Sequence, residues 1–354
     1  MKNIDLEFPT VYVVTAVFNR REVTLQFINQ LKEQTFKKIK IIIVDDGSTD
    51  ETFEAIASRY KDIKVIRGNG GWWWGGALHQ AFLYLRKSEK IYKKDIILWI
   101  NDDTLFEKNY IECAVAALRE NPGKILTSLC YSLEENELLD RGVCWNWRDF
   151  TLRIPDNDEE INCASTRGLF LNVYIAFDLG GFKPRTLPHY MSDYEYSIRA
   201  YNRGIRFFTD KNVFVRTAGG SSAVSKLEYT SVQEFYKGLF SKRFSDNPIY
   251  LMSFIYYSCP RKFQKIILWA KIFKETTRHH RELFKNSKSL KVIYIPMKKI
   301  LDCFRLSYNY IIRKKDRIQR IVKIYKYKKN KANRIKNHNI VRETSIVNNE
   351  KGRT

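Results

Sequence analysis

The amino-acid sequence predicts an α/β fold with a mostly parallel central sheet flanked by helices, followed by a helical and basic C-terminal extension. Two observations carry this prediction. Short apolar runs alternate with amphipathic stretches in the first third of the chain, and a polar or glycine-rich loop follows each run. Strands that alternate with helices form parallel sheets covered on both faces. Such sheets bind ligands at the carboxyl ends of their strands, so we expect the loops to meet at one edge.

Each element is predicted from the spacing of its apolar residues. The run VYVVTAV is β-branched and uninterrupted, as in a buried strand, whereas apolar residues three and four positions apart indicate a helix. Strands are predicted at 11–17, 40–44, 63–66 and 95–100, and helices at 22–34, 50–60 and 77–85. The loops after the four strands read FNR, DDGSTD, NGGWWWGG and NDDT.

The rest of the chain divides by composition. From about residue 127 to 210 the pattern loosens into short strands and loops, and after about 225 it becomes helical and basic. We therefore expect an α/β domain at 1–225 and a helical basic extension at 226–330. Residues 331–354 are rich in Asn, Lys and Arg and are predicted to be disordered.

The net charge of +23 belongs to the C-terminal part of the chain. Residues 261–354 carry 28 Lys and Arg against 6 Asp and Glu, whereas residues 1–260 carry 34 against 33. An enzyme acting on nucleic acid would carry positive potential around its cleft, so no nucleic-acid partner is expected. Basic helices with an apolar face favour an anionic membrane surface as the partner of residues 261–330, each cation contributing about 1 kcal/mol. A solvated helical extension is the alternative.

Several features predict the location of the protein. The start MKNIDLEFPT lacks the apolar segment of a secretory signal. The longest apolar run, 249–259, is too short to cross a bilayer, which takes about 20 residues. The six cysteines are widely separated, as in reduced thiols. We expect a cytoplasmic protein attached peripherally to the inner face of the cell membrane.

The loop NDDT places two adjacent carboxylates, Asp102 and Asp103, at the end of a buried strand. That placement is costly unless a cation neutralises them. A divalent ion that holds a diphosphate is one explanation, because Mg²⁺ and Mn²⁺ are bound by one or two carboxylates together with phosphate oxygens. A solvated turn is the other.

Two further acidic groups follow predicted elements. In VDDGSTDE, helix capping accounts for Ser48 to Asp50 but not for Asp46 at the strand tip, where a carboxylate could accept the imide N–H of uracil or thymine. In DYEYSIR, Asp193 and Glu195 begin a predicted helix, and Arg199 is close enough to orient or neutralise a carboxylate. Acids are common at helix starts, so this second motif is weak by itself.

Taken together, these motifs resemble the inverting family 2 glycosyltransferases of the GT-A fold over roughly residues 10–220. VVTAVFNR, VDDGSTD, INDDT and DYEYSIRAYNRG match the family's nucleotide-binding strand, its best-known motif, a variant DxD and its acidic block. GNGGWWWGGA and LPHYMSDYE are similar to a bacterial, rhamnosyltransferase-like subgroup that builds surface polysaccharides such as cell wall, O-antigen or capsule. By this resemblance 1–110 is the nucleotide-binding half and 111–225 the acceptor half.

The resemblance implies a role for each group of residues. Asp193 is the catalytic base, accompanied by Glu195 and Arg199, and Asp103 binds Mg²⁺ or Mn²⁺. The remaining assignments are nucleotide binding by Ala16, Phe18, Asn19, Arg20, Asp46 and Asp102; a donor sugar pocket of Gly70, Gly71, Trp73, Trp74 and Gly75; and an acceptor side with Gly168, His189 and Tyr190.

The implied reaction transfers a sugar from a UDP- or dTDP-sugar to a hydroxyl of a glycan or polyprenyl-linked glycan acceptor. The hydroxyl attacks the anomeric carbon while Asp193 removes its proton, and the metal stabilises the leaving nucleoside diphosphate. A single displacement inverts the anomeric centre. Whether the protein forms a homo-oligomer stays open.

Three departures from the family pattern qualify these roles. Asn101 occupies the first DxD position, the glycine-rich loop ends in Gly76 and Ala77, and no histidine follows the strand VFVRT, where Arg216 or Thr217 could substitute. Three adjacent indoles cannot all enter one core. Walling of the sugar pocket by one or two of them and pure core packing are both compatible with the sequence.

Other classes of protein fit less of the chain. A dehydrogenase would need GxGxxG after the first strand, and a sugar-nucleotide nucleotidyltransferase would need a basic glycine-rich loop near TAVFNRRE; neither is present. A non-enzymatic scaffold that binds membrane or nucleic acid through its basic extension would leave the acidic edge without a role.

Overall fold

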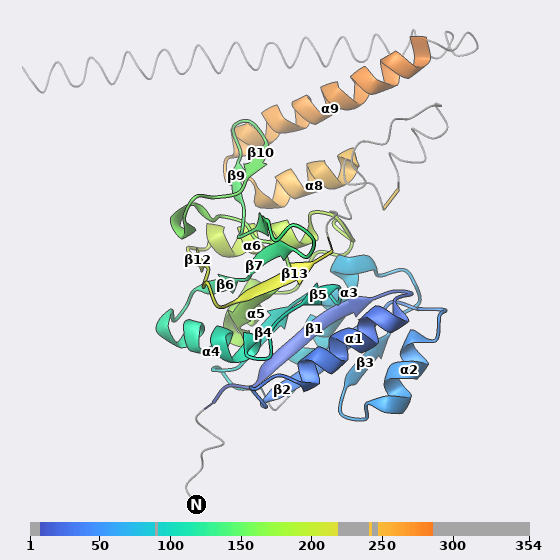
Figure 1. Cartoon of the computed structure of the whole chain (residues 1–354). Coiled ribbons are helices and arrows are strands. Elements are labelled where there is room, and N and C mark those ends of the chain that lie inside the picture. Colours follow the sequence, from blue (N-terminus) through green and yellow to red (C-terminus); the bar gives the residue numbers. More distant parts are fainter. Residues whose placement is uncertain (1–7, 89–90, 219–240, 243–246, 286–354) are drawn as a thin grey trace, which may run out of the picture. The chain divides into compact units, whose positions relative to one another are not determined.

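The computed structural model describes residues 8–88, 91–218, 241–242 and 247–285 (Figure 1). The chain forms two compact units, Met1–Thr276 and Thr277–Thr354. The first unit runs past residue 225, the predicted end of the α/β domain, because two further helices pack on it. Of the predicted basic extension only part is described, and the predicted disordered tail at 331–354 lies outside the described residues.

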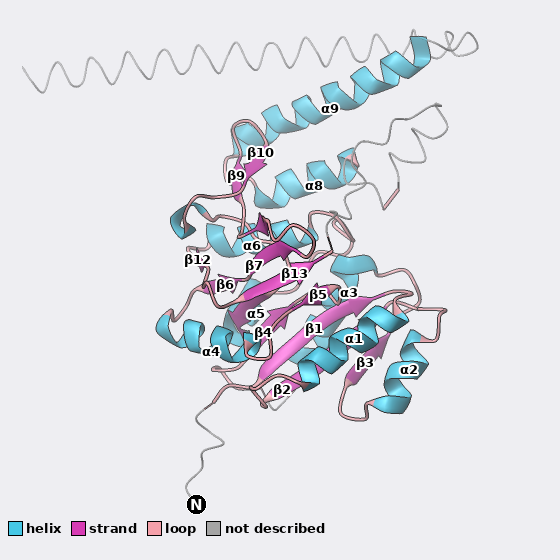
Figure 2. Cartoon of the chain, viewed as in Figure 1, coloured by secondary structure: helices cyan, strands magenta, loops and turns pink. Residues whose placement is uncertain are grey.

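A seven-stranded sheet forms the centre of the first unit, in the order β12-β6-β11-β4-β1-β2-β3 (Figure 2). Neighbours β4, β1, β2 and β3 are parallel, and β12 is parallel to β6, whereas β11 runs antiparallel to both β4 and β6. The strands are β1 Val11–Val17, β2 Ile39–Asp45, β3 Lys64–Arg67, β4 Ile96–Trp99, β6 Ile125–Thr127, β11 Leu169–Asn172 and β12 Phe207–Phe208.

Helices cover both faces of this sheet because its strands are apolar on both sides. Along β1, Val11 and Val13 face one core cluster while Tyr12 and Val14 face the other. The first cluster is closed by α1 (Arg21–Lys32), α2 (Thr52–Arg59) and α4 (Tyr110–Glu120), and the second by α3 (Trp73–Arg86), α5 (Val173–Leu179) and α6 (Ser192–Asn202). Alternate residues of a strand point to opposite faces, which accounts for the double burial.

A second sheet follows the acidic loop after β4. Its order is β5-β13-β7-β8, from Thr104–Leu105, Phe214–Thr217, Leu129–Ser132 and Leu138–Asp140. A short hairpin of β9 (Cys144–Asn146) and β10 (Thr151–Arg153) and the 3₁₀ turn η2 (Asp158–Glu160) complete this half. Thr217 pairs with Thr104, so the end of β13 lies beside the residue that follows Asp103.

The helices α8 (Pro248–Ser258) and α9 (Lys262–Lys285) form a small core of their own. Ile255 and Cys259 pack against Leu268 and Ile272. Gln264 donates to the carbonyl of Trp147, and Asn202 of α6 donates to the carbonyl of Ser258, so both helices are tied to the first unit. None of the described helices has the length and apolar character needed to cross a membrane.

The structure confirms the predicted fold class and most element positions. The strand at 11–17 is observed at Val11–Val17, and the other predicted strands begin or end within one residue of β2, β3 and β4. The prediction for the third helix is wrong at its start: α3 begins at Trp73, four residues before the predicted Ala77. Two glycines inside the first turn hide this helix in the sequence, because glycine disfavours a helix interior.

Candidate active site

The loops after β1 and β2 are joined by the side chain of Asn19. Its Oδ1 accepts a hydrogen bond from the backbone N–H of Thr49 at 2.7 Å, and its own N–H donates to Ser48 Oγ at 2.9 Å. Asn19 has a positive φ of 53°, a backbone conformation that asparagine tolerates. Phe18, beside it, has an exposed ring, while Ala16 is buried. Asn19 thus holds the loops after β1 and β2 together, whereas the exposed ring of Phe18 is accessible to a ligand.

Asp46 organises the glycine-rich loop. Its Oδ1 accepts the N–H groups of Gly70 and Trp72, both at 3.2 Å, and its Oδ2 accepts that of Trp73 at 2.7 Å. The carboxylate therefore lies at the start of α3, where it complements the helix dipole. With two lone pairs on each oxygen, Oδ2 keeps one acceptor position for a further donor, such as the imide N–H expected from the sequence.

The close approach of the loop after β2 to the glycine-rich loop requires a glycine at position 47. A Cβ at this position would lie 2.6 Å from the backbone nitrogen of Gly70, and the φ of Gly47 is +81°. No other residue satisfies both conditions without moving the loop.

The three tryptophans point in three directions. The ring of Trp72 covers Gly68, where an added Cβ would lie 2.7 Å from Trp72 Cε3. Trp73 has a positive φ of 60°, and its ring lies 5.6 Å from that of His189. Trp74 packs against the core and donates its indole N–H to Thr166 Oγ1 at 3.1 Å. The role of Trp73 and Trp74 in a sugar pocket stays a prediction.

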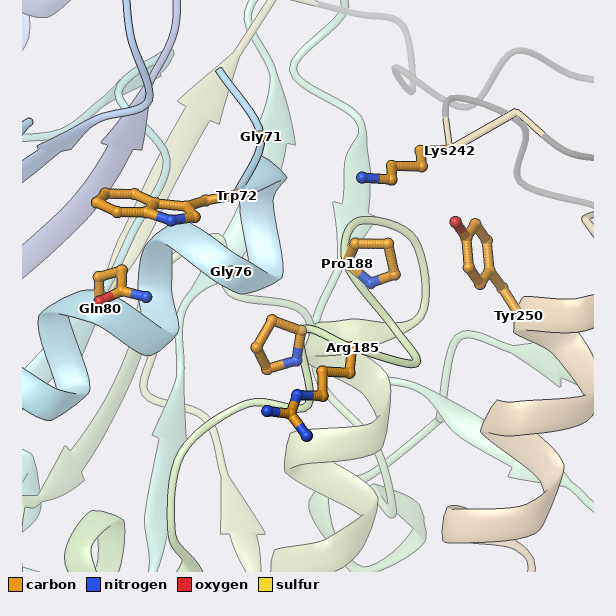
Figure 3. Close-up of a pocket in the computed structure, with 9 residues that line it drawn as sticks. Gly71, Trp72, Gly76, Gln80, Arg185, Pro188, Lys242 and Tyr250 are labelled. Atoms are coloured by element: carbon orange, nitrogen blue, oxygen red, sulfur yellow. The ribbon is translucent and has the colours of Figure 1, made fainter. Parts of the chain in front are cut away.

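Trp72 also lines a cavity of about 290 Å³ next to the glycine-rich loop. Figure 3 shows its indole beside α3, with Arg185, Pro188, Lys242 and Tyr250 on the far side of the opening. None of the five candidate carboxylates lines this cavity, namely Asp46, Asp102, Asp103, Asp193 and Glu195. The cavity lining is aromatic, proline-rich and basic.

Asp102 and Asp103 share one cation, Arg20. Arg20 Nη1 lies 3.1 Å from Asp102 Oδ1, and Arg20 Nη2 lies 3.1 Å from Asp103 Oδ2. The first contact is ionic only, because its geometry does not allow a hydrogen bond. Thr24 Oγ1 donates to Asp102 Oδ2 at 2.9 Å. The cation that the sequence requires for this acidic pair is thus supplied by the protein itself.

The two carboxylates differ in exposure and therefore in availability. The Asp102 side chain is 1% exposed and the Asp103 side chain 39%. Burial raises the pKa of Asp102 to about 6, although Arg20 and Thr24 oppose the shift. Asp102 is consequently the internal member of the pair, and Asp103 is the member that a ligand reaches.

The residues at the end of β4 fit a divalent ion. The described residues contain no group of three carboxylate, histidine or cysteine ligands. In the loop after β4, Asp103 is the more exposed carboxylate of the acidic pair. The Oδ1 of Asn101 is buried without a hydrogen-bond partner in the same loop. Mg²⁺ and Mn²⁺ accept such a sparse set, because phosphate oxygens and water complete their coordination.

Asp193 lies in the first turn of α6 and is partly buried. Burial raises its pKa to about 6, opposed by the backbone N–H of Tyr194, 2.9 Å from Oδ1, and by the charge of Arg167. A carboxylate with such a pKa is ionised at neutral pH and basic enough to take a proton from a reacting hydroxyl.

Sequence reasoning missed Arg167. Its neighbour Gly168 donates its N–H to the carbonyl of Trp99, and its other neighbour, Thr166, holds the indole of Trp74. Arg167 therefore lies at the carboxyl end of β4, and its charge opposes the burial that raises the pKa of both Asp193 and Cys130. No local pattern in the sequence marks Arg167, because its position follows from the pairing of β11 with β4.

Glu195 and Arg199 form a scaffold contact and not a reactive one. Arg199 Nε and Nη2 bind the two oxygens of Glu195 at 3.0 and 2.9 Å, and the Glu195 side chain is 1% exposed. The guanidinium also donates to the carbonyls of Leu179, Gly180 and Gly181, which end α5. Every charged atom of the pair is thus used inside the fold, and the assignment of both residues to the catalytic group stays a prediction.

Two glycines assigned to ligand pockets also pack against protein. A Cβ on Gly75 would lie 2.7 Å from Ser192 Cβ, and a Cβ on Gly168 would lie 2.5 Å from both Ser128 Oγ and the Tyr110 hydroxyl. Neither position has room for a side chain, and the assignment of both glycines to ligand pockets stays a prediction. By contrast, Gly70 and Gly71 remain in the exposed loop, and Gly71 borders the cavity.

Gly75 joins the glycine-rich loop to the helix that carries Asp193. The N–H of Gly75 donates to the carbonyl of Pro188 at 2.8 Å, and Ser192 Oγ donates to the carbonyl of His189 at 2.6 Å. In the same segment, the ring centroids of His189 and Tyr190 are 4.4 Å apart. The segment 187–192 is thus a bridge between α3 and α6.

Arg216 and Thr217, the two possible substitutes for the histidine of the family pattern, lie in different surroundings. Arg216 lies 3.7 Å from Glu107 and stacks on Phe214, whereas Thr217 pairs with Thr104 beside the acidic loop. In the register of β13 with β5, Thr217 is therefore closer to Asp103 than Arg216 is. The residues from 219 to 240 lie outside the described part of the chain.

Comparison with known proteins gives a family match. Residues 12–174 match the family described as "Glycosyl transferase family 2". An uncharacterized glycosyltransferase of Rickettsia typhi is 32% identical over 124 residues, which are 34% of this chain and 36% of the relative. Glycosyltransferase GlyG of Streptococcus pneumoniae is 23% identical over 130 residues, 36% of this chain and 41% of the relative. The aligned segment thus spans well under half of these curated relatives.

Solved structures show a partial likeness over most of the chain. The mannosyltransferase PcManGT of Pyrobaculum calidifontis, in complex with GDP-Man and Mn²⁺, aligns with a TM-score of 0.47 at 14% identity, covering 86% of this chain and 85% of that one. TarS of S. aureus with UDP-GlcNAc gives 0.46 at 18% identity, covering 80% and 76%. Residues 12–174, which include nearly all of β1 and the whole of β2 and β4 in the mostly parallel sheet, are thus similar to glycosyltransferase family 2.

Proposed function

We propose that this protein transfers a sugar from a nucleoside-diphosphate sugar, a UDP- or dTDP-sugar, to a hydroxyl of a glycan or lipid-linked glycan, with inversion at the anomeric carbon. One observation carries the proposal: within the segment that matches family 2, the strand ends of β1, β2 and β4 bring together an exposed aromatic ring, an ordered glycine-rich loop and an accessible carboxylate. The rhamnosyltransferase-like subgroup and a role in surface polysaccharide synthesis belong to the same proposal.

The donor would bind along the edge formed by these loops. Phe18 offers its exposed ring to the base, and the loop held by Asp46 offers backbone N–H groups and glycines to the phosphates and the sugar. Asp103 would hold Mg²⁺ or Mn²⁺, which when bound neutralises charge on the diphosphate. Arg20 adds a guanidinium at the same place.

Asp193 would act on the acceptor. The acceptor hydroxyl attacks the anomeric carbon, its proton passes to Asp193, and the bond to the diphosphate oxygen breaks so that the nucleoside diphosphate leaves with the electron pair. The bridge 187–192 ties this base to the start of α3, so the donor loop and the base share one framework.

A panel of UDP- and dTDP-sugars tests the proposal. We expect one donor to raise the melting temperature of the protein in the presence of Mn²⁺ and to be hydrolysed slowly without acceptor. Asp103→Ala should abolish the metal-dependent part of both signals. A nucleotidyltransferase would need a nucleoside triphosphate, so consumption of UTP or dTTP with sugar phosphate, and no reaction with a ready-made sugar nucleotide, would refute the assignment.

We also propose that the α8–α9 surface attaches the protein peripherally to the inner face of the cell membrane. Tyr256, Phe263 and Ile266 are exposed there, beside Arg261 and Lys262. Apolar side chains that are flanked by cations suit the interface of an anionic bilayer.

Flotation with vesicles that contain anionic lipid tests this attachment. Because Leu268 and Ile272 are buried against α8, deleting everything from residue 261 would open a core. The double variant Phe263→Ser with Ile266→Ser leaves that core intact and should reduce binding, and Tyr92→Ser, an exposed aromatic elsewhere, is its control. Equal binding by both variants would contradict the proposal.

A further inference from the structure

Arg20 occupies the position at Asp102 and Asp103 where another cation could otherwise bind. It bridges Asp102 and Asp103 with one nitrogen on each, at 3.1 Å in both cases. The three residues come from the ends of two neighbouring strands, β1 and β4. This contact is separate from the helix that follows, since Arg20 precedes α1 and its side chain makes no cap hydrogen bond there.

The two halves of the bridge are unequal. Asp102 is buried and accepts a hydrogen bond from Thr24 as well as pairing with Arg20, so it keeps a polar partner inside the protein when the Asp103 contact opens. Asp103 and Arg20 are 39% and 38% exposed, and Asp103 Oδ2 is held by Arg20. The contact between Arg20 and Asp103 is therefore the one that can open at little cost, as expected of exposed ion pairs.

A divalent ion and the guanidinium compete for the same carboxylate. Two cations beside one carboxylate repel each other, so an ion that binds Asp103 weakens the contact of Arg20 Nη2 with that carboxylate. If the ion arrives without nucleotide, the displaced nitrogens lose a partner. If it arrives with a diphosphate, the phosphate oxygens give the guanidinium a new one, and arginine binds phosphate well.

We propose that Arg20 is an internal counter-ion that occupies the place of the divalent ion until the donor brings it, so that ion and nucleoside diphosphate bind together. This inference rests on the proposed donor class. Its consequence is a positive coupling in which each ligand raises the affinity for the other by the same factor, as linkage requires. Arg20 is in this account a positioning residue that couples the two ligands.

Binding of Mn²⁺ alone to the full chain, measured from the electron paramagnetic resonance signal of the free ion, tests the proposal. Arg20→Gln should bind Mn²⁺ about tenfold more tightly than wild type, within the usual range of coupling between sites. Arg20→Lys, which reaches one carboxylate at a time, should fall between the two. Arg21→Gln is the matched control, because Arg21 pairs with Glu51 and Glu22 and does not touch the acidic pair.

The second half of the experiment adds UDP or dTDP at saturating Mn²⁺. Arg20→Gln should bind the diphosphate more weakly than wild type, while Arg21→Gln should match wild type. Unchanged or weaker Mn²⁺ binding by a folded Arg20→Gln overturns the inference, and if that variant does not fold, wild-type-like Mn²⁺ binding by Arg20→Lys overturns it. If wild type binds neither diphosphate, the proposed donor class fails, whereas the Mn²⁺ comparison still decides the role of Arg20.

Discussion

Two contacts between an arginine and an acidic residue differ in their surroundings in the fold. Arg199 and Glu195 are four residues apart on α6, and their pair is buried and bonded to three carbonyls at the end of α5. Arg20 and Asp103 are distant in the chain, and both are more than a third exposed. The first contact holds two helices together, while the second leaves its charges within reach of a ligand. The additional partners of each guanidinium therefore distinguish a structural contact from a contact in the candidate site.

The sharpest test of this comparison lies within one helical turn. Asp193 and Glu195 are two residues apart in α6, yet only Glu195 has its charge fully used inside the protein. We expect Asp193→Asn to lower sugar transfer by about 100- to 10,000-fold, the usual contribution of a general base. Donor affinity, measured by calorimetry, should be unchanged. Transfer above a tenth of the wild-type rate would remove Asp193 from this role.

The next prediction concerns the scaffold pair. Arg199→Ala leaves Glu195 buried and unpaired, which should lower the free energy of unfolding by about 3–5 kcal/mol. Arg203→Ala on the same helix removes an exposed pair with Asp178 and should cost less than about 1 kcal/mol. Urea unfolding measures both. Equal losses in the two variants would break the distinction between scaffold and surface.

A third prediction probes the bridge between the two regions. Gly75→Ala places a methyl group 2.7 Å from Ser192 Cβ and 2.8 Å from the carbonyl of Leu187, and we expect a loss of about 1–3 kcal/mol in stability. Gly76→Ala, on the same turn, meets Trp72 Cβ at 3.1 Å and should be milder. The free energies of unfolding from urea titrations give the comparison, and a larger loss for Gly76→Ala would contradict the packing described.

The smallest expected effect is a shift of pH dependence. As the proposed base, Asp193 would act in its ionised form, so the transfer rate should rise as the pH increases through about 6, its raised pKa. Because the charge of Arg167 lowers that pKa, Arg167→Gln should move the acidic limb of the rate profile to higher pH. Arg167→Lys keeps the charge and serves as control. A limb that stays in place, or moves to lower pH, would show that Arg167 does not act on the base.

Most of the fold could be predicted because periodicity is local. VYVVTAV specifies β1 without reference to any other segment, and the loop after each strand follows from the parallel order. The start of α3 could not be predicted, because Trp73 takes a positive φ and donates to Asp46, a residue far away in sequence. Tertiary contacts there override the low helix propensity of Gly75 and Gly76.

The candidate site was predictable in its residue types but not in its geometry. Asp102, Asp103 and Asp193 were found because acids at strand and helix ends are visible in sequence. Asp102 accepts a hydrogen bond from Thr24, and Glu195 binds Arg199, which also donates to a carbonyl at the end of α5. Both arrangements depend on packing between segments that are distant in the sequence. Arg167 was missed for the same reason, since only the pairing of β11 with β4 brings it to the edge.

The hydrogen bond from Gly75 to Pro188 has a consequence for engineering. Under the proposed function, a designer would exchange residues of segment 187–192 to accept a different glycan, but the backbone of this segment is hydrogen-bonded to the first turn of α3. A grafted segment of another length would therefore also displace the start of α3. A new acceptor specificity would have to be sought by replacing side chains on an unchanged backbone, or by moving α3 and segment 187–192 together.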